Sequence, residues 1–230
     1  AAHTPVIDTS DVFYDGNSQG GILGGAVTAV SNQWTRAVLG VPGMNYSTLL
    51  QRSVDFNLYQ TFLDPAYPDE MDRMLSFSIV QMLWDRAEAD GYAAHMTSSP
   101  YENTPEHKVL LHMAFGDHQV ANIATETEAR TIGASVREPA LAPGRDTAVV
   151  PLWGIPPITQ YPFDGSALVV WDSGTPAPPD ANLPPNPPQY GADPHEKPRS
   201  QVSAREQKSE FLQTNGAVVD VCGTSPCLAP

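Results

Sequence analysis

The sequence predicts an α/β fold built around a buried parallel sheet. Three short apolar runs, at residues 37–41, 109–115 and 167–171, contain no Asp, Glu, Lys or Arg, as expected of strands covered on both faces. The segments between these runs have helical spacing. Strands that alternate with helices favour an α/β sheet.

The first element is a strand followed by a tight turn and a helix. Residues 12–14 are apolar, the turn reads Gly16-Asn17-Ser18-Gln19-Gly20, and a helix of small residues is expected over 21–30. This order suits a serine nucleophile elbow, in which the serine is strained and the residues two before and two after it must be small. In the alternative interpretation, the turn is a glycine-rich connection and Ser18 only caps the helix.

A helical segment follows, over residues 45–105. Its clearest helix is expected at 68–89, because Pro68 suits the first turn and acidic residues follow at the positive end of the helix dipole. Gly91 ends it. One stripe of this helix is apolar, which favours packing against the core over a dedicated ligand surface: Met71, Leu75, Ile79, Met82 and Leu83.

The second half contains further helices and a long irregular segment. A helix is expected over 120–133, and residues 207–221 supply a last helix and an apolar end. Residues 175–198 are too rich in proline for regular structure.

Three residues have the types and the order of a catalytic triad. A serine hydroxyl needs an imidazole to take its proton and a carboxylate to orient that imidazole. Ser18, Asp117 and His195 occur in the order serine, acid, histidine, with Asp117 directly after a strand and His195 in a proline-stiffened loop. Asp193 is the second-ranked acid, because it lies very close to His195 in the chain.

The other histidines and the late acidic residues fit simpler roles. His118 adjoins Asp117 and either lines the site or gates the carboxylate, whereas His112 lies inside a strand and is expected to pack there. His95 and His107 lack the spacing of metal ligands, and the terminal His3 is expected to be solvated. Solvation is favoured over calcium binding for four loop aspartates: Asp164, Asp172, Asp180 and Asp193.

A resemblance to a known family is carried by the motif Gly16-Asn17-Ser18-Gln19-Gly20-Gly21, the segment Gly116-Asp117-His118-Gln119-Val120 and the late His195. The chain resembles the C-terminal part of an α/β-hydrolase, similar to bacterial secreted esterases and lipases. The resemblance covers nearly the whole chain, from residue 12 to about residue 211. It implies a nucleophile elbow with its following strand over 1–44, a helical cap insertion over 45–105, and the C-terminal part of the hydrolase core with a Pro-rich histidine loop over 106–230.

The resemblance also implies roles and a partner. Ser18 would be the nucleophile, Asp117 the orienting acid, His195 the general base and the backbone N–H of Gln19 one oxyanion donor. In the family the nucleophile follows the fifth strand of the sheet. An N-terminal half of the same hydrolase is therefore expected as a separate chain, formed by cleavage before Ala1, that supplies the first strands and the second oxyanion donor. No cofactor or metal is expected.

Composition narrows the classes of partner and compartment. With 26 acidic and 12 basic residues the net charge is −14, which disfavours nucleic acid and anionic lipid. No apolar run approaches the roughly 20 residues of a transmembrane helix. Cys222 and Cys227 lie close enough for a small disulfide loop, although two free thiols are an alternative. A disulfide indicates a secreted, periplasmic or cell-surface protein.

Together these features predict a serine hydrolase that cleaves carboxylic esters through an acyl-enzyme intermediate. A cap containing Met71, Met74, Phe77, Met82 and Trp84 favours hydrophobic esters, as in an esterase or lipase. The alternatives are a peptidase or amidase of the same fold and a catalytically silent binding protein.

Overall fold

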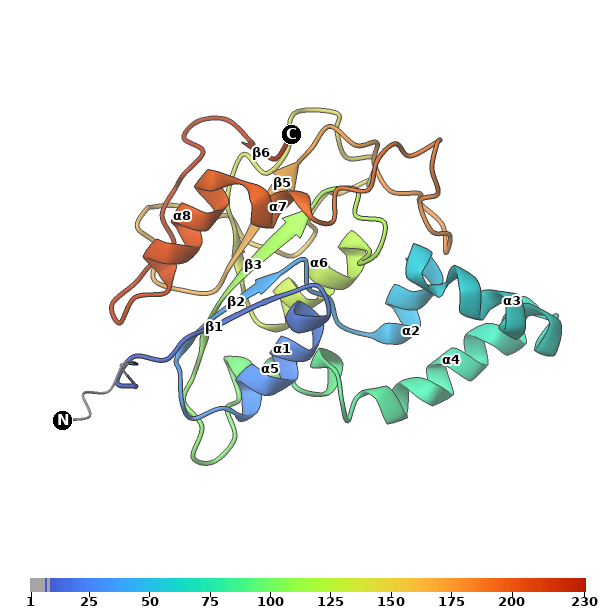
Figure 1. The fold of residues 1–230 in the computed structure, drawn as a ribbon, viewed down its shortest axis with the longest axis horizontal. Coiled ribbons are helices and arrows are strands. Elements are labelled where there is room, and N and C mark those ends of the chain that lie inside the picture. Colours follow the sequence, from blue (N-terminus) through green and yellow to red (C-terminus); the bar gives the residue numbers. More distant parts are fainter. Residues whose placement is uncertain (1–6, 8) are drawn as a thin grey trace, which may run out of the picture.

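A computed structural model describes residue 7 and residues 9–230 of the chain; the predicted solvation of His3 lies outside the described residues. The sheet has the order β1 (Tyr14–Asn17), β2 (Arg36–Gly40), β3 (Lys108–Ala114), β5 (Ala167–Asp172) and β4 (Ser135–Val136), and β6 (Cys227–Leu228) also pairs with β5. Every one of these pairings is parallel (Figure 1). The predicted α/β class is confirmed.

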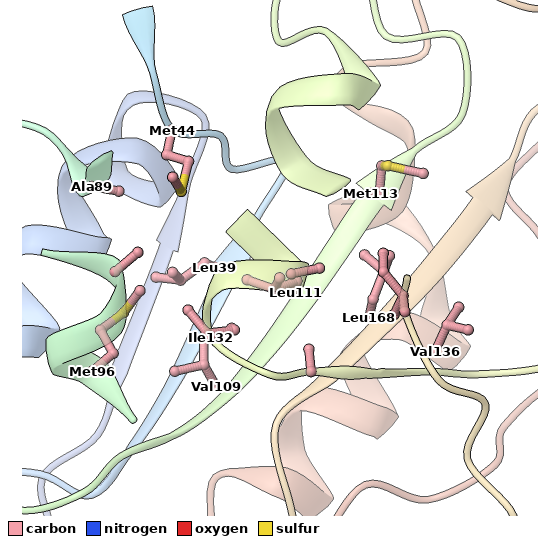
Figure 2. Packing of buried hydrophobic residues seen from close by; sticks show 14 of the residues in the cluster. Leu39, Met44, Ala89, Met96, Val109, Leu111, Met113, Ile132, Val136 and Leu168 are labelled. Atoms are coloured by element: carbon pink, nitrogen blue, oxygen red, sulfur yellow. The ribbon is translucent and has the colours of Figure 1, made fainter. Parts of the chain in front are cut away.

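Alternate residues of the central strands enter two separate cores. In β3, Val109 and Leu111 belong to one apolar cluster, whereas Leu110 between them belongs to the other. The same alternation occurs in β2 and β5, as the twofold repeat of a strand requires. Figure 2 shows the first cluster, where Leu39, Leu111 and other side chains lie on one face of the sheet.

Helices cover both faces. The first core includes residues of α1 (Gln19–Val30), α5 (Ala93–Met96) and α6 (Asn122–Thr131), and the second includes residues of α8 (Val202–Phe211). The short helix α7 (Lys197–Ser200) directly precedes α8 (Figure 1). The sheet is thus the middle of three layers, which explains why its strands are almost free of charge.

Helices and short helical turns form the connection from β2 to β3. They are α2 (Tyr46–Leu49), η1 (Leu50–Arg52), η2 (Val54–Phe56), α3 (Asn57–Ala66), α4 (Glu70–Trp84), η3 (Ala89–Gly91) and α5. Helices α3 and α4 lie beside each other, away from the sheet (Figure 1). The ion pair of Arg73 with Asp64 joins them, and Phe56, directly before α3, makes an edge-to-face contact with Phe77 of α4.

The packing predicted for α4 is wrong. Its buried residues are Phe77 and Gln81, which face α3 and the body, whereas the predicted apolar stripe is exposed. The stripe faces outward because the α3–α4 hairpin stands off the sheet and has no layer above it. The exposed fractions are large: Met71 72%, Leu75 60%, Ile79 58%, Met82 69% and Leu83 64%.

Several other boundaries differ from the predictions. Strand β1 begins two residues after the expected start at residue 12, and α8 begins at Val202 instead of residue 207. Only short helical turns precede α3 over residues 46–56, and the Ser53 side chain caps one of them by accepting from the N–H of Asp55. Cys222 and Cys227 form a disulfide, so the free-thiol alternative is excluded. No helix within the described part of the chain has the length and apolar character needed to cross a bilayer.

Candidate active site

Ser18 occupies the turn between β1 and α1 in a strained backbone conformation. Its φ is 59° and its ψ −122°, a region that residues with a side chain rarely adopt. The Ser18 N–H donates to the carbonyl of Gly40, 2.9 Å away at the end of the neighbouring strand, and this bond holds the turn against the sheet. The Ser18 side chain forms no capping hydrogen bond, so the capping interpretation is wrong.

The turn requires glycine, but at partly different positions from those expected. A Cβ on Gly16 would lie 2.2 Å from the carbonyl oxygen of Gly20, and a Cβ on Gly21 would lie 2.6 Å from that of Gly40. A Cβ on Gly20 would meet only the hydroxyl of Tyr14 at 3.9 Å, an ordinary contact. The close approach of these backbone carbonyls therefore explains why positions 16 and 21 are glycine. The expected need for a small residue at Gly20 is wrong.

His195 bridges Ser18 and Asp117. Its Nε2 lies 2.7 Å from Ser18 Oγ, and its Nδ1 lies 3.0 and 2.8 Å from the two carboxylate oxygens of Asp117. Ser18 follows β1, Asp117 follows β3, and His195 lies in the long connection after β5. Parallel strands end at the same edge of the sheet, so three residues far apart in the sequence meet there.

Burial and charge tune the His195–Asp117 pair. Burial alone lowers the pKa of His195, but the hydrogen bond and charge of Asp117, with smaller effects from Asp193 and Glu196, outweigh it, and the pKa is raised. Burial raises the pKa of Asp117, although the hydrogen bond from His195 counteracts it. With Asp117 on Nδ1, the His195 Nε2 atom can accept the Ser18 proton.

Asp193 holds the histidine loop without touching the imidazole nitrogens. Its Oδ1 accepts from the backbone N–H groups of His195 at 3.0 Å and of His118 at 3.2 Å. Its Oδ2 accepts from the side-chain amide of Gln119 at 2.8 Å. Asp193 therefore connects the loop that carries His195 to the loop that carries Asp117. The carboxylate that contacts His195 Nδ1 is Asp117.

The remaining histidines lie outside this arrangement. The His118 ring is buried, and its Nε2 has no hydrogen-bond partner among the described residues. His112 is buried in β3 with its Nε2 2.9 Å from Gln207 Oε1, and burial lowers its pKa to about 3, so it packs as a neutral ring. His95 stacks on Tyr101, and buried His107 faces the carbonyl of Met96.

A cavity of about 240 Å³ opens beside Ser18. Gln19 also lines it, and the N–H of Gln19 is in the first turn of α1, where helix N–H groups have no partner within the helix. Trp84 is the one residue of the five predicted cap residues that reaches this cavity. Sequence reasoning did not assign its other apolar residues to the site: Ile22, Tyr46, Leu49, Leu50 and Val120.

One carboxylate cluster has the spacing of a metal site but is filled by protein donors. Asp85, Glu88 and Asp90 bring their oxygens within 4.8 Å of one another. The Glu88 carboxylate already accepts from the backbone N–H groups of Asn45, Tyr46 and Asp90. The Gln81 amide nitrogen lies 2.6 Å from Asp85 and 2.7 Å from Glu88. We therefore assign this cluster to holding α2 against the end of α4.

The late aspartates differ from one another. Asp172 is buried and forms two hydrogen bonds to Arg145, so the expectation of simple solvation is wrong for it. Asp164 is exposed and pairs with Lys108 and Arg36, and Asp180 accepts from Thr147.

Comparison of the chain with protein-family models, with curated proteins and with solved structures found no match. The geometry of Ser18, Asp117 and His195 is therefore the observation from which a function is inferred.

Proposed function

We propose that the chain is a serine hydrolase that cleaves carboxylic esters through an acyl-enzyme intermediate. The observation that carries the proposal is His195, whose two ring nitrogens lie within hydrogen-bond distance of Ser18 and of Asp117. A strained serine, a buried imidazole and a buried carboxylate in this order match the requirements for an activated nucleophile.

The reaction follows from these contacts. His195 Nε2 takes the Ser18 proton while Oγ attacks the ester carbonyl, and the N–H of Gln19 stabilises the oxyanion. The imidazolium returns the proton to the leaving alkoxide as the carbon–oxygen bond breaks. A water molecule then gives a proton to His195 and attacks the acyl group, and release of the acid restores the Ser18 hydroxyl.

The cavity beside Ser18 favours an apolar acyl or alcohol group. Its apolar residues include Ile22, Tyr46 and Trp84. Its polar residues are Ser18, Gln19, Ser53, Asp55 and Gln119. A hydrophobic ester places its chain along the apolar residues and its carbonyl at Ser18. The outward-facing Met71 and Met82 do not contribute to this cavity.

We also propose that a second polypeptide, an N-terminal half of the same hydrolase, completes the sheet. Among the described strands, β1 pairs with β2 alone and its other edge is open. Helix α1 contains no charged residue, yet Leu23, Val27 and Val30 are exposed along it by 36–55%. A helix that is uncharged on every side is normally buried on every side. A strand added to β1 would end near Ser18, where its following loop would supply the second oxyanion donor.

Labelling with an activated fluorophosphonate tests the function. We expect one adduct, on Ser18, and we expect Ser18→Ala to lose both the adduct and roughly four to six orders of magnitude in ester turnover. Ser53→Ala is the matched control, because Ser53 lines the same cavity but has no imidazole partner. The Ser53→Ala variant should still be labelled on Ser18. A Ser18→Ala variant with normal turnover would rule out the mechanism.

The same assay distinguishes the alternatives. Faster turnover of an anilide than of the matched ester would indicate an amidase or peptidase. A folded protein, assembled with its partner, that takes no label would be a silent binding protein. The Cys222–Cys227 disulfide supports the proposal that the enzyme works in an oxidising compartment, outside the cell, in the periplasm or at the cell surface.

A further inference from the structure

The outer face of α4 is the most unusual surface of the molecule. Leu75, Ile79 and Leu83 are about 60% exposed, and no charged residue occurs between Met74 and Trp84. Water-exposed helices of soluble proteins usually carry charged residues on their outer face. A contiguous exposed apolar face of this kind indicates a contact surface.

The two charges that flank this face have opposite signs and lie on the same stripe. Asp72 is in the first turn of α4, and Arg86 follows the last turn, where its N–H still bonds to the carbonyl of Leu83. Both side chains are exposed, and neither forms an ion pair with any residue that the structure describes. The full stripe advances by three or four residues at each step: Asp72, Leu75, Ile79, Leu83 and Arg86.

We propose that this stripe is a homodimer interface, in which α4 packs antiparallel against α4 of a second copy. A twofold axis beside Ile79 brings Ile79 against the same residue of the other copy and Leu75 against Leu83. The same register brings Asp72 of each copy to Arg86 of the other. The apolar and charged groups of the stripe in one copy are thus matched by those of the same stripe in the other copy, as an isologous interface requires.

Self-complementarity selects a second copy over other occupants. A helix that binds anionic lipid carries Lys and Arg along its polar face, whereas this stripe has one charge of each sign, one at each end. The neighbouring helix α3 also exposes apolar side chains, at Leu58, Tyr59 and Phe62. The proposal does not depend on the chemistry of Ser18.

Cysteine cross-linking of the soluble protein, co-expressed with the proposed N-terminal half, tests the geometry. The native cysteines are paired, so an introduced thiol reports only on its own neighbours. Ile79→Cys should give a disulfide-linked dimer on a non-reducing gel. The control Val149→Cys, at an apolar side chain that is 99% exposed in a loop, should stay monomeric. Equal cross-linking of both variants, or of neither, would overturn the proposal.

Charge reversal tests the register. Arg86→Glu should raise the dissociation constant of the dimer at least about tenfold, and Asp72→Arg combined with Arg86→Glu should restore it. Both positions are exposed, and circular dichroism will show whether each variant is folded. Sedimentation equilibrium measures the constants. A soluble wild-type assembly that holds a single copy of this chain up to about 100 μM, or a double variant as weak as the single one, would contradict the α4–α4 pairing. Association of wild-type monomer with neutral lipid vesicles would assign the stripe to a lipid surface instead.

Discussion

The Asp193 carboxylate accepts a hydrogen bond from the side-chain amide of Gln119 at 2.8 Å, and this bond joins the two loops that carry His195 and Asp117. The bond explains how a histidine in a long proline-rich connection is held against a buried carboxylate. It also gives the two acids different tasks. Asp117 contacts the imidazole, whereas Asp193 fixes the backbone that carries it.

The first prediction separates these tasks by substitution. Asp117→Asn should reduce ester turnover by up to about ten-thousand-fold, because an amide on Nδ1 favours the wrong imidazole tautomer. Asp193→Asn should cost far less, since an amide still fits between the loops. Initial rates with an activated ester measure both effects, and circular dichroism checks folding. The reverse ranking would mean that Asp193 is the catalytic acid.

The second prediction concerns pH. Because Asp117, Asp193 and Glu196 together raise the pKa of His195 above its usual 6.5, turnover should fall with decreasing pH around a midpoint above that value. The negative charge of Asp193 favours the protonated ring. Asp193→Asn should therefore lower the midpoint, and the control Asp180→Asn, at an exposed loop position, should leave it unchanged. The pH profile of kcat/KM gives these midpoints. A shift to higher pH in Asp193→Asn would contradict the sign argued here.

The third prediction distinguishes the glycines of the elbow. Gly16→Ala and Gly21→Ala should each lower the free energy of unfolding by about 1–3 kcal/mol, because their Cβ atoms collide with backbone carbonyls. Gly20→Ala has room for its methyl group and lies in α1, so it should be neutral or gain up to about 1 kcal/mol. Urea unfolding ranks the three variants. Gly20→Ala as the most damaging of them would contradict the packing described for the turn.

A fourth prediction uses the buried carboxyl of Glu128. It is fully buried, and neither of its oxygens has a hydrogen-bond partner among the described residues. Burial, and then the charge of Glu88, raise its pKa well above the usual 4.5. The folded state therefore binds the proton more tightly than the unfolded state. The stabilising effect of the protonated Glu128 carboxyl on the folded state is present below pH 4.5 and is lost as the pH rises through the pKa that this carboxyl has in the folded state.

Glu128→Gln keeps the shape of a neutral side chain and removes this titration. The difference in unfolding free energy between variant and wild type should grow in favour of Gln as pH rises from 4 to 8, by at most about 1.4 kcal/mol per pH unit. Glu206→Gln, at an exposed position of α8, is the control and should show no such trend. Thermal unfolding at several pH values measures the trend. Parallel pH curves for wild type and Glu128→Gln would contradict the assignment.

Local patterns predicted much of the fold and the three residues of the proposed triad. The strands at residues 109–115 and 167–171 could be found because a short uncharged apolar run is typical of a strand covered on both faces, and Ser18 because a strand and a helix flank its turn. The exposure of Ile79 could not be predicted, since helical periodicity defines a face but not what covers it. Tyr46 and Leu49 enter the cavity through tertiary packing and match no motif. The loop-joining role of Asp193 depends on backbone groups that no sequence pattern marks.

The last prediction concerns the open edge of the sheet. A parallel strand such as β1 is normally paired on both sides, and an exposed edge beside an uncharged helix promotes aggregation. Residues 1–230 expressed alone should therefore be insoluble or inactive, and co-expression with the proposed N-terminal half should restore soluble, active enzyme. Val27→Glu on the exposed side of α1 should block this rescue, whereas Val149→Glu, at a 99% exposed loop side chain, should not. The rescued interface should be apolar and bury well above about 2,000 Å², as interfaces that complete a core do. Fluorophosphonate labelling of the soluble fraction measures recovery. A soluble and fully active product from residues 1–230 alone would show that β1 is a natural edge and that both oxyanion donors belong to this chain.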